Sequence, residues 1–137
     1  MVRKIKFRAW DIENKKMINN AVVANGHYMQ TYPDMDIKED FPLMQDTGLT
    51  DKNGTEIYEG DIVSYRGTIE QPGGVLIREQ VGVIKIDKGM TGFQGITKQT
   101  YKGEVRTHES KTLLLSPEIY EVIGNIHDNP ELLEVGK

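Results

Sequence analysis

Apolar and charged residues alternate at the start of the chain. Between residues 4 and 9, the apolar Ile5, Phe7 and Ala9 alternate with the cations Lys4, Lys6 and Arg8. A period of two places apolar side chains on one face of a strand and cations on the other. Turn-forming residues follow at 11–16, and apolar residues at 17–18 and 21–24 could form the returning strand. The pattern predicts a β-hairpin over residues 3–24.

A second hairpin is predicted around Asn53-Gly54. This dipeptide lies between two partly apolar runs, 43–49 and 55–58. Both of its residues tolerate the positive φ that tight hairpin turns require. Gly60 then permits a sharp bend into a short β-branched strand at 62–65.

Further short strands follow in the second half of the chain. They are predicted at 75–77, 81–86, 90–95, 111–115 and 121–126, with Phe93 and Ile96 as the buried residues near the third of these. Residues 25–42, 66–74 and 98–110 lack periodicity and are polar or rich in Gly and Pro, which predicts loops. The spacing favours a meander or a small barrel over βαβ units.

Two Pro-containing segments predict short helical turns. Ser116 could cap a turn that starts with Pro117. Residues 128–133 repeat the signal and predict a terminal helix whose Leu132 and Leu133 dock on the barrel. A chain of 137 residues is long enough for one domain with its own core. The sequence thus predicts a single mainly β domain over 1–137, with an N-terminal hairpin, long loops and a short C-terminal helix.

Charge and composition narrow the function classes. Lys and Arg number 17 against 21 Asp and Glu, so the net charge of -4 provides no global positive field for nucleic acid. The absence of cysteine excludes disulfides, thiol catalysis and thiolate metal sites. No apolar run has the length of a signal peptide or a membrane span. We therefore expect a cytoplasmic protein without a membrane partner.

Three separated blocks occur in order along the chain. They are KFRAWD at 6–11, a central block over 43–63 that contains DKNG and EIYEGDIV, and VIGNI at 122–126 with NPELL at 129–133. Together they resemble the YopX family of small phage and prophage proteins. The resemblance implies a mainly β fold akin to an SH3-type barrel, encoded by a phage or a prophage, and no established activity. Asp46 and His127 depart from the family pattern, and either could lie at a surface patch.

No residue set predicts catalysis or a cofactor. Asp34, Asp36 and Lys38 superficially resemble a Mg²⁺-dependent nuclease site, but they are crowded into one polar connection, which favours a solvated loop. The histidines, His27, His108 and His127, lack the spacing of a zinc site. They are expected to be structural, although a site assembled by folding stays open.

Two functional hypotheses remain. The favoured one is a non-enzymatic interaction module whose segments 25–42, 64–80 and 98–115 contact a protein partner or a second copy, because binding residues concentrate on loops and open strand edges. The alternative is nucleic-acid binding through Lys4, Lys6, Arg8 and Trp10, where cations and an aromatic ring share one strand. A Mg²⁺-dependent hydrolase is the weaker third option.

Overall fold

The computed structural model describes residues 6–19, 22–24, 27–30, 36–38 and 41–134, and within 22–38 it describes the backbone alone. Strands dominate it, and they form a four-stranded, a five-stranded and a three-stranded sheet. The five-stranded sheet curls into a half-barrel. The predicted mainly β fold with a small barrel is confirmed.

The N-terminal sheet has the order β2-β1-β6-β7. Its strands are β1 (Phe7–Asp11), β2 (Lys16–Ile18), β6 (Leu43–Thr50) and β7 (Glu56–Tyr58). The predicted hairpin is confirmed for β1 and β2, where Ala9 lies opposite Ile18. The hairpin at Asn53-Gly54 is also confirmed, since β6 and β7 are antiparallel and Gly54 has a φ of 81°.

The second half of the predicted N-terminal hairpin is wrong. Residues 22–24 do not pair with β1, because β6 occupies that edge of the strand. They form β3 (Val22–Ala24), which pairs with β4 (His27–Gln30), and β4 pairs in turn with β5 (Asp36–Lys38). The predicted loop at 25–42 therefore contains two short strands.

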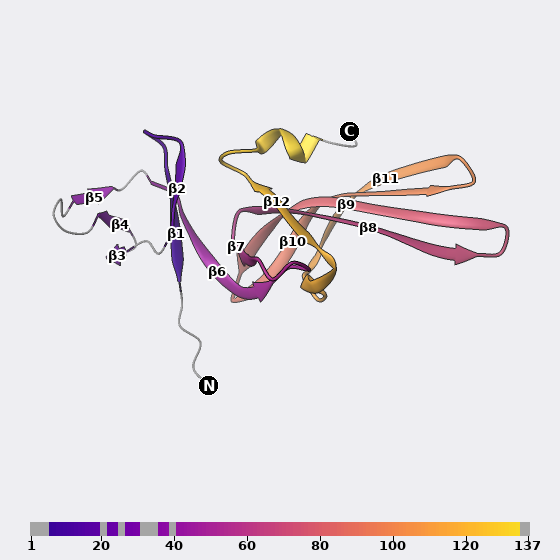
Figure 1. Cartoon of the computed structure of the whole chain (residues 1–137), viewed down its shortest axis with the longest axis horizontal. Helices are drawn as coiled ribbons and strands as arrows, with labels where there is room; N and C mark the ends of the chain where they lie inside the picture. The colour runs from indigo at the N-terminus through magenta and orange to yellow at the C-terminus, as the bar shows by residue number, and fades with distance from the viewer. Residues whose placement is uncertain (1–5, 20–21, 25–26, 31–35, 39–40, 135–137) are drawn as a thin grey trace.

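The five-stranded sheet has the order β11-β10-β9-β8-β12. Its strands are β8 (Asp61–Gln71), β9 (Gly74–Asp87), β10 (Met90–Tyr101), β11 (Glu104–Leu113) and β12 (Glu121–Asn125). The first four form two long hairpins, β8 with β9 and β10 with β11, which project to the right in Figure 1. Their outer ends extend beyond the rest of the sheet.

The loops predicted at 66–74 and 98–110 are wrong, because these residues form the outer ends of the long hairpins. Both faces of the strands are largely exposed there, so no alternation of apolar and polar residues marks them. Only two-residue turns remain. In one of them Lys102 and Gly103 have φ of 51° and 75°, the left-handed values of a tight hairpin turn.

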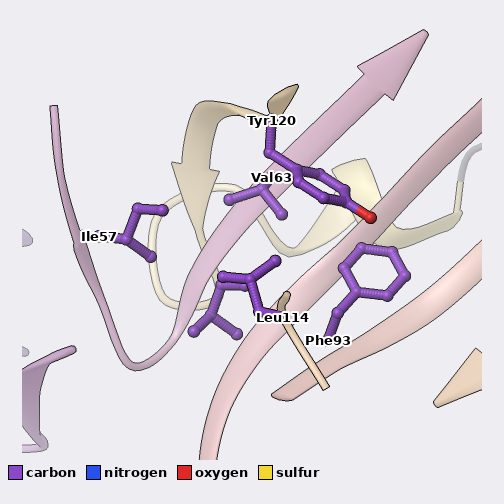
Figure 2. Close-up of a cluster of buried hydrophobic side chains, with 6 residues drawn as sticks. Ile57, Val63, Phe93, Leu114 and Tyr120 are labelled. Atoms are coloured by element: carbon purple, nitrogen blue, oxygen red, sulfur yellow. The ribbon is translucent and has the colours of Figure 1, made fainter. Parts of the chain in front are cut away.

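The main core lies on one face of the half-barrel. Its buried residues are Ile57, Val63, Ile84, Phe93, Leu114 and Tyr120, and Figure 2 shows five of them converging from separate elements. Phe93 is buried as predicted, but Ile96 is only partly buried because it faces the other side of β10. Gly82 leaves room for Phe93, since a Cβ at residue 82 would lie 2.6 Å from the ring.

Both predicted helical turns are present as 3-10 helices. They are η1 (Pro117–Ile119) and η2 (Pro130–Glu134). The predicted side-chain cap is wrong, because Ser116 accepts the Ile119 N–H through its backbone carbonyl instead, at 3.2 Å. Leu132 and Leu133 are partly buried, and η2 packs against β9. No helix within the described residues has the length and apolar character needed to cross a membrane.

Candidate functional site

The predicted cationic strand is held against acidic residues. Lys6 pairs with the Glu56 carboxylate, and its Nζ lies 3.9 Å from Asp46. Arg8 pairs with Asp61, and its guanidinium lies 4.4 Å from the centroid of the Tyr58 ring. The structure therefore uses these two cations to join β1 to β7 and β8. Lys4 lies outside the described residues.

Asp61 is the most deeply buried acid of this group, with 1% of its surface exposed. Burial raises the pKa of its carboxyl, while the Arg8 guanidinium and the Tyr58 backbone N–H, which donates to it at 2.8 Å, oppose the increase. A buried carboxylate with these two partners is a structural anchor, because removal of either partner would leave charge without compensation.

Trp10 is buried rather than presented to solvent. Its ring stacks on the imidazole of His127, with centroids 5.8 Å apart and an interplanar angle of 15°. Burial lowers the pKa of His127, and the nearby charge of Arg8 lowers it further. The predicted surface position of His127 is thus replaced by a half-buried aromatic contact between the two ends of the chain.

An apolar groove of about 880 Å³ opens between the start of β6 and the half-barrel. Its lining includes Met90, Leu113 and Ile126, of which 53%, 49% and 36% of the surface is exposed. Met44 and Phe93, both buried, are also among its lining residues. Sequence analysis missed this groove because its residues come from separate strands that only the packing of the sheets brings together.

Strand β11 borders this groove and forms an edge of the half-barrel. It pairs with β10 on one side, and no strand of the described residues pairs with it on the other. Lys111 and Leu113 lie opposite Gln94 and Gly92 and face the groove. The segment 98–115, predicted as a contact loop, therefore includes a ten-residue edge strand.

The described residues do not cover the predicted metal sites completely. Asp34 lies outside the described residues, and Asp36 and Lys38 lie on β5, opposite Gln30 and Tyr28. Within the described part of the chain, no three His, Cys, Asp or Glu side chains are grouped as metal ligands would be. The Mg²⁺ site at Asp34, Asp36 and Lys38 and a metal site assembled from the histidines by folding both remain predictions.

Comparison with known proteins agrees with the three sequence blocks. The model of the YopX protein family matches residues 6–134. The crystal structure of protein EF1440 from Enterococcus faecalis is similar, with 26% identity and a TM-score of 0.56 over 96% of this chain and 99% of that chain. No curated protein sequence matches the chain. The matched region runs from β1 to η2 and includes the groove and β11.

Proposed function

Because the chain belongs to the YopX family, we propose that it is a phage or prophage accessory protein without enzymatic activity that self-assembles through β11. The observation that carries the proposal is the open edge of this ten-residue strand. Free backbone N–H and C=O groups along an edge are a template for another strand. The occupant we propose is β11 of a second copy.

Symmetry restricts how two such strands can pair. A two-fold axis that continues the sheet makes the strands antiparallel and keeps each side chain on its own face. When the axis passes through Ser110, Glu109 lies opposite Lys111 of the second copy, and the same pair occurs twice. An axis through residue 109 would instead place the Glu109 side chains of the two copies opposite each other, and an axis through residue 111 would do the same for Lys111. Opposite charges in this position contribute roughly 0.2–1 kcal/mol per pair.

The same register covers exposed apolar side chains. Leu113, which is 49% exposed, comes opposite Thr107 of the second copy. If the pairing continues two residues beyond β11, then Leu115, 82% exposed, meets Val105, 52% exposed. Charges of a single sign on an edge strand prevent such pairing. Strand β11 carries charges of both signs, and in the antiparallel pair Glu109 of each copy lies opposite Lys111 of the other.

The test is the mass of the full chain in solution, measured by sedimentation over a concentration series. We expect a monomer–dimer equilibrium for the wild type. Glu109→Lys and Lys111→Glu should each weaken the dimer, because each places like charges opposite, and the double exchange should restore it. Glu70→Lys, an exposed position on β8, is the control and should leave the mass unchanged.

Two results would contradict the proposal. One is a monomer at every concentration. The other is a dimer whose dissociation constant neither single charge reversal raises, since each reversal places like charges opposite each other in this register.

Nucleic-acid binding through the first strand has less support. Lys6 and Arg8 neutralise Glu56 and Asp61, and Trp10 is covered by His127. If the alternative were nevertheless correct, Lys6→Glu would reduce the shift of an oligonucleotide in an electrophoretic titration at low salt. If the first strand does not bind nucleic acid, Lys6→Glu should leave the electrophoretic shift unchanged.

A further inference from the structure

The outer ends of the two long hairpins form a continuous surface, which we call the arm (residues 65–80 and 97–108). They extend side by side from the half-barrel in Figure 1. Their tips are joined, because the Tyr101 hydroxyl donates to the Pro72 carbonyl at 2.8 Å. The arm therefore presents two faces, and these faces differ in chemistry.

One face of the arm continues the core, and we call it the inner face. Its first row is Tyr65, Gln80, Thr97 and His108, which lie opposite one another on successive strands. Gln80 and Thr97 belong to a buried hydrogen-bonded chain that reaches Tyr120. The next row outward is Gly67, Arg78, Gln99 and Arg106. A cavity of about 270 Å³ lies on this face, between Leu76, Gln99, Tyr101 and Arg106 among others.

The inner face is locally cationic, although the whole chain is acidic. It carries Arg78 and Arg106 against a single acid, Glu104, with which Arg106 pairs at 3.2 Å. Both members of that pair are largely exposed, so the pair holds the guanidinium only weakly.

The opposite face of the same strands is balanced. It carries Arg66 and Lys98 against Glu70 and Glu79, and Arg66 lies 4.0 Å from Glu79. Each face thus holds two cations on these strands, but only the inner face has cations in excess.

Aromatic rings accompany the cations on the inner face. Tyr65 lies along the sheet over Gly67, where a Cβ would come within 1.9 Å of the phenolic oxygen. The missing Cβ at Gly67 leaves room for the phenol group, and the partly buried ring also contacts Tyr120, with ring centroids 5.8 Å apart. Tyr101 stands at the tip, with Lys102 Nζ 5.4 Å from its centroid. Flat rings on which bases stack, beside cations that contact phosphates, are the chemistry of single-stranded nucleic-acid binding.

We propose that the inner face of the arm binds single-stranded nucleic acid. Tyr65 stacks on a base, and Arg78 and Arg106 contact the phosphates on either side. A duplex fits less well, because its paired and stacked bases leave no ring free to lie on Tyr65. Binding at this face does not require the pairing of β11 with a second copy, which adds a strand at the edge of the sheet and leaves both of its faces uncovered.

Fluorescence anisotropy of a labelled oligo(dT) with the full chain tests it. We expect binding that weakens steeply as salt rises, and a loss of affinity of about tenfold for Arg78→Glu or Arg106→Glu. Arg66→Glu and Lys98→Glu are matched controls, since they make the same charge change on the same sheet but on the opposite face. They should leave the affinity nearly unchanged.

The aromatic contribution is tested separately. Tyr65→Leu should weaken binding while Tyr65→Phe retains it, with circular dichroism as the check that both fold. Absence of binding at low salt, or equal losses from the two faces, would overturn the proposal. Equally effective competition by polyglutamate would also overturn it, because it would show a surface for acidic chains in general.

Discussion

The carboxylate of Asp51 accepts the backbone N–H of Val122 at 2.9 Å, although 71 positions separate the two residues. Its other oxygen accepts the N–H groups of Asn53 and Thr55, each at 2.9 Å. One side chain therefore orders the turn between β6 and β7 and ties it to β12, an edge of the half-barrel.

Replacement of Asp51 by Asn should destabilise the protein. The amide offers one acceptor oxygen in place of two, so at least one of these part-buried hydrogen bonds to a charged group is lost, at a cost of about 1–3 kcal/mol. Urea denaturation measures the change in the free energy of unfolding. Asp87→Asn, at an exposed position, is the control and should change it little. Equal stability of the two variants would show that the Asp51 contacts are dispensable.

Stability should also depend on the titration of Asp51. Burial alone would raise the pKa of its carboxyl, but the N–H groups of Val122, Thr55 and Asn53 outweigh burial and hold the pKa below its ordinary value. The resulting stability is complete above the unfolded pKa of about 3.9 and is lost as the pH falls through the lower folded value. Between about pH 5 and about pH 2, the urea midpoint of the wild type should therefore fall further than that of Asp51→Asn.

The wild type and Asp51→Asn are compared because the titration of Asp61 changes the stability in the opposite direction. Burial raises the pKa of Asp61, so its contribution improves as the pH falls. Both proteins retain Asp61, and the charge of Asp51 is the smallest of the causes that shift the pKa of Asp61, so the difference between the proteins reports mainly on Asp51. Parallel curves for the two proteins would contradict the assignment.

Gly60→Ala should cost more than Gly54→Ala. Both glycines have positive φ, 89° and 81°, so both substitutions carry a backbone cost of about 1–2 kcal/mol. At Gly60 the new Cβ would also lie 2.9 Å from the sulfur of Met44, whereas at Gly54 nothing lies within 4 Å. Thermal and urea unfolding of the two variants give the difference. Equal destabilisation would mean that Met44 moves aside without cost.

Tyr120→Phe should destabilise the core more than Tyr58→Phe does. The Tyr120 hydroxyl donates to Gln80 at 2.8 Å within the buried chain, and its removal leaves the amide oxygen of Gln80 unpaired. We expect a loss of about 1–3 kcal/mol. The Tyr58 hydroxyl makes only a long contact, 3.4 Å, to Glu56, and its removal should cost less. Urea denaturation of both variants measures the two losses in the free energy of unfolding, and equal losses would contradict the prediction.

The sequence by itself determined the local elements whose signals lie within a few residues. The alternation around Phe7 predicted β1, Asn53-Gly54 predicted its turn, and Pro117 and Pro130 predicted the two helical turns. Backbone preferences and side-chain period act over such short distances, and they do so whatever the rest of the chain does.

Only the tertiary structure decided the remainder. The outer ends of the long hairpins are polar and exposed, so no apolar period revealed them, and neighbouring strands specify their pairing. The sequence placed Lys6 and Arg8 on one strand, but the packing of β7 and β8 against that strand set Glu56 and Asp61 beside them. Ion pairs, the groove and the two faces of the arm depend on contacts between distant segments, which form when the sheets pack together.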